Sequence, residues 1–174
     1  MARIAVLTVS DRAARGEYAD LGGPAAEEWL RRVITSDIEI LRRITPDGRA
    51  EVAAALCDLA DVWGADLILA TGGTGPSPRD LTPEAVGDVV SMHLPGFGEA
   101  MRAANGRVVA TAILSRQGAA VRGATLIIML PGSPNAIATS LEAVFAAVPY
   151  CLDLIGAARI ETDPAVIKAH RPKT

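Results

Sequence analysis

Asp66-Leu67-Ile68-Leu69-Ala70-Thr71-Gly72-Gly73-Thr74-Gly75 joins a short aliphatic run directly to a glycine-rich loop. An apolar run of this length, followed by turn residues, is typical of a strand that is covered on both faces of a parallel sheet. Three other runs have the same form and also end in polar or glycine-rich turns: residues 3–9, 38–45 and 125–130. The sequence therefore predicts four buried strands.

Helical patterns lie between these strands. Val52, Leu56, Leu59 and Trp63 follow spacings of four, three and four residues, which mark one face of an amphipathic helix. Strands that alternate with helices imply right-handed crossovers. The predicted fold is a three-layer α/β/α sandwich with a mostly parallel central sheet.

Prolines and one capping residue mark the limits of further helices. Pro24 is expected at the first position of a helix, and Thr82 is expected to cap a helix that has Pro83 at its first position. A long helix is expected from Asn135 onward, with an interruption at Pro149.

The remaining segments have weaker patterns. Residues 94–117 predict two short helices and one more strand. We expect one domain over residues 1–160, followed by a polar, loosely attached tail over residues 161–174.

Composition and charge exclude several classes of protein. Aromatic residues make up 3% of the 174 residues, which argues against a nucleic-acid surface built from stacking rings. The net charge of -3 leaves no basic excess for binding a phosphate backbone. No apolar run approaches the ~18 residues that span a membrane, and no signal-peptide pattern is present, so we expect a cytoplasmic location. Cys57 and Cys151 lie in helical patterns and are expected to be buried, reduced thiols.

Four turns follow the predicted strands. They are Ser10-Asp11, Asp47, Thr71–Gly75 and Pro131–Pro134. Ligands of open α/β sheets bind beyond the carboxyl ends of the strands. These turns are therefore expected to line one crevice.

The glycine-rich loop is suited to an anion. Its three glycines leave backbone N–H groups unshielded, and its two threonines add hydroxyl donors. The loop is neither a Walker A sequence nor a GxGxxG fingerprint, which disfavours a P-loop kinase and a Rossmann dehydrogenase. Taken alone, the loop could also be a simple turn between a strand and a helix.

Charged residues near the loop favour phosphate chemistry. The Arg79 guanidinium can bind a phosphate. The Asp80 carboxylate would repel a phosphate, so its position beside the loop indicates a divalent cation between the carboxylate and the ligand. Asp47 is either a second carboxylate for that cation or a turn residue. Asp11 with Arg12 is either a surface ion pair or a further cation contact.

A second ligand is also indicated. The turn Pro131-Gly132-Ser133-Pro134 leads into a helix, and Ser115 and Arg116 add a hydroxyl and a guanidinium. His93 and His170 have no partner at metal-ligand spacing, so a histidine-based metal site is not expected. The residues alone predict phosphoryl or nucleotidyl transfer with Mg²⁺.

The sequence resembles the MogA/MoaB family of molybdopterin-binding proteins. The matching stretches occur in the family's order: Ser10-Asp11-Arg12, Thr71-Gly72-Gly73-Thr74-Gly75, Arg79-Asp80-Leu81-Thr82-Pro83-Glu84, Pro95-Gly96-Phe97-Gly98-Glu99, Ala112-Ile113-Leu114-Ser115-Arg116, Leu130-Pro131-Gly132-Ser133-Pro134 and Val148-Pro149-Tyr150-Cys151. Residues 27–30, 111–117 and 171–173 favour the adenylyltransferase (MogA) branch over the MoaB branch. The resemblance implies transfer of AMP from ATP to molybdopterin, with release of pyrophosphate.

The resemblance also implies roles for individual residues. The family's two essential aspartates correspond to Asp47 and Asp80, which would hold Mg²⁺ against the ATP phosphates. The expected nucleotide contacts are Thr71, Gly72, Gly73, Thr74, Gly75 and Arg79. The expected pterin contacts are Ser10, Asp11, Ser115, Arg116, Pro131, Gly132 and Ser133.

The resemblance further implies a homotrimer and contact with the enzyme that inserts molybdenum. Two other functions remain open at this stage. One is a non-catalytic or MoaB-type molybdopterin-binding protein of the same pathway, and the other is a scaffold for a neighbouring enzyme. Retention of both Asp47 and Asp80 favours the catalytic interpretation.

Overall fold

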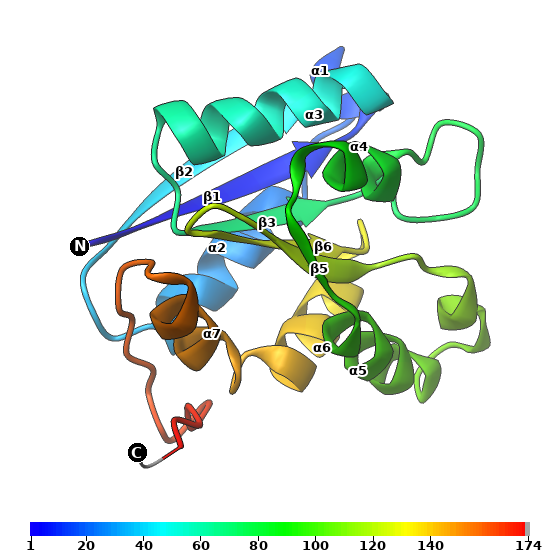
Figure 1. The fold of residues 1–174 in the computed structure, drawn as a ribbon. Coiled ribbons are helices and arrows are strands. Elements are labelled where there is room, and N and C mark those ends of the chain that lie inside the picture. Colours follow the sequence, from blue (N-terminus) through cyan, green and yellow to red (C-terminus); the bar gives the residue numbers. More distant parts are fainter. Residues whose placement is uncertain (173–174) are drawn as a thin grey trace.

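Six strands form one sheet in the order β2-β1-β3-β6-β5-β4 in the computed structural model, which describes residues 1–172 (Figure 1). The strands are β1 Ala2–Val9, β2 Ile38–Thr45, β3 Leu67–Thr71, β4 Met92–Leu94, β5 Gly118–Arg122 and β6 Thr125–Leu130. β2, β1, β3 and β6 are parallel neighbours, whereas β5 is antiparallel to both β6 and β4. The prediction of a mostly parallel central sheet is confirmed.

Helices cover both faces of this sheet (Figure 1). The helical elements are α1 Asp11–Ala14, α2 Gly22–Val33, α3 Arg49–Cys57, the π-helical turn η1 Asp58–Val62, α4 Thr82–Val89, α5 Pro95–Gly106, the 3₁₀ turn η2 Ala110–Leu114, α6 Pro134–Val144 and α7 Val148–Ile155. One face packs against α3, η1 and α4, and the other packs against α2, α5, α6 and α7. The predicted three-layer sandwich is therefore confirmed.

The alternation of side chains along the strands builds the two cores. In β1, Ile4 and Val6 belong to the core beside α2 and α6, whereas Ala5 and Leu7 belong to the core beside α3 and α4. All four side chains are fully buried. Because both faces are covered, the strand is aliphatic at every position from Ile4 to Leu7 rather than at every second one.

The antiparallel end of the sheet differs from the prediction. The strand expected within residues 94–117 is absent; β4 ends at Leu94 and β5 begins at Gly118 instead. The two helices expected in that segment are present as α5 and η2. β5 reads Gly-Ala-Ala-Val-Arg, which carries little strand propensity of its own. Its hairpin with β6, which turns at Gly123 with φ +56°, supplies the pairing.

Three helix limits were also wrong. Pro24 is the third residue of α2, and Thr82 lies inside α4 and makes no side-chain cap. The break between α6 and α7 falls at residues 145–147, before Pro149. Pro149 lies in the first turn of α7, where the missing N–H costs no helical hydrogen bond.

The segment after residue 160 is hydrogen-bonded to the rest of the chain as far as Arg171. Ile160 is fully buried, and Thr162 forms an antiparallel bridge with Ile34. The guanidinium of Arg171 pairs with the Asp153 carboxylate at 2.5 Å, and this pairing raises the pKa of Arg171. The domain boundary at residue 160 stays a prediction, and the predicted features at residues 173–174 lie outside the described residues.

The two cysteines lie in helices as predicted, at the end of α3 and within α7. Both are unpaired and partly exposed rather than fully buried. Burial nevertheless raises the pKa of the Cys151 thiol. Within residues 1–172 no single helix is long and apolar enough to cross a membrane; α6 and α7 meet that test only together, as a pair bent by 67°.

Candidate functional site

The carboxyl ends of four parallel strands meet at one edge of the sheet. Val9 at the end of β1 is in register with Thr45 of β2, and Thr71 of β3 is in register with Leu130 of β6. The turns that follow are tied together, because Ser10 N donates to the Thr45 carbonyl at 2.9 Å. The hydroxyl of Thr71 donates to the Pro131 carbonyl at 2.8 Å. The four turns therefore meet at one edge of the sheet, as expected. They do not line one single crevice, because two pockets open at this edge and Asp47 lines neither of them.

The glycine-rich loop has a backbone that requires glycine. Gly72 and Gly73 have φ of +100° and +63°. A Cβ at Gly72 would collide with the Val9 carbonyl, and one at Gly73 would collide with the Thr82 hydroxyl. The loop therefore lies against the end of β1 and the start of α4.

The start of α4 is fastened to this loop. The Thr82 hydroxyl donates to the Gly72 carbonyl at 2.9 Å, and Thr82 N donates to the Gly73 carbonyl at 3.1 Å. The side chain expected to cap the helix thus holds the loop instead. The partial positive charge of the helix N-terminus lies beside the loop, where it favours an anion.

Two pockets open at this edge and share Gly72 and Gly132 as a common wall. The Ser10 pocket, of about 220 Å³, is lined by Thr8, Val9, Ser10, Arg12, Ala13, Tyr18, Asp20, Leu21, Gly22, Thr71, Gly72 and Gly132. The Gly75 pocket, of about 370 Å³, is lined by Gly72, Gly73, Thr74, Gly75, Pro76, Asp80, Thr111, Leu114, Ser115, Pro131 and Gly132. A site with two compartments suits two ligands.

The structure divides the residues that were predicted to contact the pterin. Ser10 lines the Ser10 pocket, whereas Ser115 and Pro131 line the Gly75 pocket. Asp11, Arg116 and Ser133 line neither of these two pockets. Ser133 is the N-cap residue of α6, although its side chain makes no capping hydrogen bond.

Asp11, Asp47 and Arg79 form a charged cluster beside the pockets. Asp11 N donates to Asp47 Oδ2 at 2.7 Å, and Asp47 N donates to Asp11 Oδ1 at 3.1 Å. The Arg79 guanidinium donates to both Asp11 carboxylate oxygens, at 2.9 and 2.8 Å, and to the Asp47 carbonyl at 2.7 Å. Arg79 therefore joins the turn after β2 to the segment that carries Asp80.

Arg116 stabilises the glycine-rich loop through hydrogen bonds. Its backbone N–H donates to the Thr74 carbonyl at 2.7 Å, and its Nε donates to the Gly75 carbonyl at 3.0 Å. The same guanidinium donates to the Asp80 carbonyl and to the Glu84 carboxylate. This hydrogen bond and the nearby positive charge lower the pKa of Glu84. The structure thus directs the Arg116 side chain toward the loop and α4.

Asp47 and Asp80 carry the two carboxylates that the sequence resemblance assigns to a magnesium ion. One oxygen of Asp47 accepts from Asp11 N, and one oxygen of Asp80 accepts from Ser77 N at 3.1 Å, which leaves the second oxygen of each for a ligand. Within residues 1–172 no group of three or more His, Cys, Asp or Glu side chains could hold a metal. Mg²⁺ commonly binds through one or two carboxylates together with phosphates and water, whereas a full protein cage is typical of other metals.

Several residues of this edge were missed by the sequence reasoning. The Asp20 carboxylate accepts from the Thr8 hydroxyl and from Gly23 N, both at 2.9 Å, and shapes the Ser10 pocket. An aspartate three residues before a helical N–H is a helix-start signal that could have indicated it. Tyr18 was also missed: the Arg12 guanidinium, in α1, lies over its ring at 5.0 Å, a contact that no spacing rule marks.

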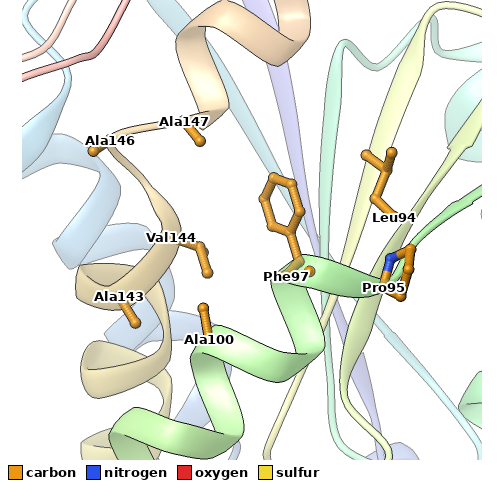
Figure 2. A pocket seen from close by; sticks show the side chains of 9 residues that line it. Leu94, Pro95, Phe97, Ala100, Ala143, Val144, Ala146 and Ala147 are labelled. Carbon is orange, nitrogen blue, oxygen red and sulfur yellow. The ribbon is translucent and has the colours of Figure 1, made fainter.

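An apolar hollow of about 460 Å³ lies elsewhere, between α5 and the turn that joins α6 to α7. Figure 2 shows the Phe97 ring standing between Leu94 and the wall formed by Val144 and Ala147. All nine lining residues are apolar or glycine. No polar side chain lines the hollow and none of the residues predicted for the site lies in it, so it is not the candidate site.

The chain is similar to known proteins over nearly its whole length. Residues 5–150 match the model of a family described as "Probable molybdopterin binding domain". The molybdopterin adenylyltransferase of Escherichia coli K12 is 44% identical over 184 aligned residues, which cover 99% of this chain and 94% of that protein. The molybdopterin adenylyltransferase of Helicobacter pylori 26695 is 46% identical over 170 residues, covering 98% and 97%.

Solved structures give the same result for the fold. The molybdopterin biosynthesis enzyme MoaB from Thermus thermophilus has a TM-score of 0.82 at 41% identity, covering 91% of this chain and 99% of that one. The molybdopterin biosynthesis Mog protein from Mycobacterium ulcerans has a TM-score of 0.82 at 37% identity, covering 89% and 99%. The fold is therefore shared equally with a MoaB and a Mog protein.

Proposed function

The chain belongs to the family of probable molybdopterin binding domains, and we propose that it is a molybdopterin adenylyltransferase of molybdenum cofactor biosynthesis. The reaction transfers AMP from ATP to molybdopterin and releases pyrophosphate. The observation that carries this proposal is the sheet edge where a glycine-rich loop lies between two pockets, with Asp80 lining one of them. Relatives that are named molybdopterin adenylyltransferases align over nearly the full chain.

The reaction needs no nucleophile from the protein. It needs the two substrates to be held in the correct position. An oxygen of the terminal phosphate of the pterin attacks the α-phosphorus of ATP, while the bond between that phosphorus and the pyrophosphate oxygen breaks. The electron pair of that bond leaves with pyrophosphate. Catalysis in such a reaction comes mainly from alignment and neutralisation of charge.

The glycine-rich loop supplies donors for the phosphates. Residues 72–75 line the Gly75 pocket. The Gly72 N–H already donates to the Leu130 carbonyl at 3.1 Å, so the N–H groups of residues 73–75 are the proposed phosphate donors. Asp47 and Asp80 would hold Mg²⁺. When bound, this ion supplies positive charge to the reacting phosphates. Arg116 keeps the loop and the backbone of Asp80 in one position through its hydrogen bonds to the Gly75 and Asp80 carbonyls.

The two pockets suggest how the ligands divide. Ser115, Pro131 and Gly132 would contact the pterin in the Gly75 pocket, where they face the loop. Ser10 would contact a ligand in the Ser10 pocket, across the wall formed by Gly72 and Gly132. Asp11 and Arg79 act together to position Asp47, since each is bonded to it or to its turn. Ser133 begins α6 through its backbone, because its carbonyl accepts from Ile137 N at 2.9 Å.

We also propose a homotrimer in the cytoplasm, with the molybdenum-insertion enzyme as a partner. Exposed apolar side chains support an interface between subunits, because Val108, Ile113 and Leu114 are 78%, 80% and 54% exposed in the single chain. Light scattering on the purified protein tests the assembly. A monomer at micromolar concentration would contradict the trimer.

Pyrophosphate release tests the proposed activity. We expect pyrophosphate only when the protein, ATP, Mg²⁺ and molybdopterin are all present, and we expect EDTA to abolish it. A binding protein without activity would bind molybdopterin and release no pyrophosphate under the same conditions.

A further inference from the structure

A chain of buried polar side chains lies between α5, α6 and the start of β5. Asn105, Ser140 and Gln117 are 5%, 0% and 2% exposed. Asn105 Nδ2 donates to the Ser140 hydroxyl at 2.8 Å, and this hydroxyl donates to Gln117 Oε1 at 3.2 Å. Polar groups buried this deeply normally have all their hydrogen bonds satisfied.

The structure places Oε1 of the Gln117 amide toward Ser140. Asn105 Nδ2 also donates to the Met101 carbonyl at 2.9 Å, and a carbonyl can only accept. The amide nitrogen of Asn105 must therefore lie on this side and donate to Ser140, whose own hydrogen is then free for Gln117 Oε1. The amide nitrogen of Gln117 therefore takes no part in this chain of hydrogen bonds.

Gln117 Nε2 has no hydrogen-bond partner among the described residues. An unpaired buried donor is costly, so a partner that supplies an acceptor is expected. Gln117 lines a cavity of about 180 Å³, together with Asn105, Val109, Thr111, Ala112, Ser115, Pro131 and Ala136. We refer to it as the Gln117 cavity.

The Gln117 cavity adjoins the candidate site. Thr111, Ser115 and Pro131 line both this cavity and the Gly75 pocket. Pockets for ligands of drug size measure about 300 to 1,000 Å³, so the cavity suits part of one ring system rather than a whole nucleotide. Its residues, apart from Asn105 and Gln117, are apolar or carry only a hydroxyl, as suits a flat heterocycle.

We propose that Gln117 is a specificity-determining residue whose Nε2 donates to a carbonyl oxygen or ring nitrogen at the edge of the pterin. This inference rests on the proposed function, in which Ser115 and Pro131 lie on the pterin side. Because Gln117 Oε1 is already used by Ser140, the side chain offers a donor without an acceptor. A carbonyl edge matches that pattern. The ring nitrogens of adenine also accept, so the choice of the pterin rests on Ser115 and Pro131, which line the cavity and lie on the pterin side of the proposed site.

Separate titrations with molybdopterin and with ATP test the inference. Gln117→Met keeps the length of the side chain and removes the donor. We expect the Kd for molybdopterin to rise about 10-fold, the equivalent of one hydrogen bond, while the Kd for ATP stays unchanged. Ser140→Ala is the matched control, since it removes a hydrogen bond of the same chain and keeps the donor. It should weaken molybdopterin binding much less.

Three outcomes would overturn the inference: an unchanged Kd for molybdopterin in Gln117→Met, equal weakening by Gln117→Met and Ser140→Ala, or weakening of ATP binding instead. If Gln117→Met does not fold, Gln117→Glu at pH 8 replaces it, because a carboxylate accepts from Ser140 and offers no donor. Absence of AMP transfer by the unaltered protein would contradict the proposed function. Unaltered molybdopterin affinity of the variant, in a protein whose parent is active, contradicts only the role of Gln117.

Discussion

Asp11 and Asp47 exchange hydrogen bonds, each backbone N–H donating to the other's carboxylate, at 2.7 and 3.1 Å. These two hydrogen bonds join the turn that follows β1 to the turn that follows β2. Arg79 strengthens this connection by binding both Asp11 oxygens and the Asp47 carbonyl. The position of Asp47 therefore depends on two residues from distant parts of the chain.

Asp11→Ala should lower AMP transfer even though Asp11 need not touch a substrate. The substitution removes the acceptor for Asp47 N and for Arg79, so the turn that carries Asp47 is held less firmly, although the N–H of residue 11 still donates to Asp47 Oδ2. We expect turnover to fall about 10-fold, as small displacements of reacting groups commonly cause. Steady-state rates of pyrophosphate release measure the effect. Asp58→Ala, which removes an exposed partner of Arg43 at 2.5 Å, is the matched control, and an equal loss there would contradict the positioning role.

Asp80→Asn should separate binding from chemistry. The amide keeps an acceptor for Ser77 N and loses the negative charge that would hold Mg²⁺. We expect AMP transfer to fall about 100-fold, while the affinity for molybdopterin is retained. Calorimetric titration and the rate assay measure the two quantities. Asp61→Asn at the exposed ion pair with Arg122 is the control, and undiminished turnover in Asp80→Asn would remove the proposed metal-holding role.

Arg116→Lys should damage the loop although the charge is kept. The planar guanidinium reaches the Gly75 carbonyl, the Asp80 carbonyl and the Glu84 carboxylate together, and an ammonium group cannot reproduce this geometry. We expect kcat to fall about 10-fold, with a smaller change in the affinity for molybdopterin. A selective loss of molybdopterin affinity at unchanged kcat would instead show that Arg116 contacts the pterin directly.

Gly73→Ala and Gly87→Ala should have opposite effects on stability. Alanine at Gly73 must adopt φ +63° and meet the Thr82 hydroxyl, which lowers the free energy of unfolding by about 1 to 3 kcal/mol. Gly87 is exposed within α4 and has open space around its Cα, so alanine there raises the free energy of unfolding by about 0.5 to 1 kcal/mol. Urea unfolding followed by circular dichroism measures both. Equal stability of the two variants would contradict the loop geometry.

The Glu84 ion pair should make stability depend on pH in acid. Arg116 lowers the pKa of the Glu84 carboxyl below its ordinary value of 4.5, so the unfolded state takes up a proton first as the pH falls. The pair's contribution is fully present above about pH 4.5 and is lost as the pH falls through the lowered folded-state pKa. We expect Glu84→Gln to be less stable than the parent at pH 7, and the difference to shrink below pH 4.5. A difference that does not depend on pH would contradict this account.

Much of the parallel half of the fold could be predicted from the sequence. β1, β3 and β6 are continuous aliphatic runs because both faces are covered, and that pattern is visible without a structure. β5 could not be predicted, because its short run of small residues becomes a strand only through pairing with β6. Where the strand propensity of a segment is weak, pairing with a neighbouring strand determines whether the segment forms a strand.

The site shows a similar division. The glycine-rich loop and the convergence of the four turns follow from sequence and from the geometry of parallel sheets. The partners of Arg79 and Arg116 do not, because each guanidinium binds groups between 32 and 68 residues away in the chain. The donor left free on Gln117 depends on a hydrogen-bond chain through two helices. Composition and residue spacing do not indicate hydrogen bonds between residues that lie so far apart in the chain.

The most direct test is to incubate the protein with ATP, Mg²⁺ and molybdopterin and to identify the products by mass spectrometry. We expect adenylylated molybdopterin and pyrophosphate in equal amounts, with no product when any one component is omitted. Binding of molybdopterin without formation of the adenylylated product would contradict the proposed activity.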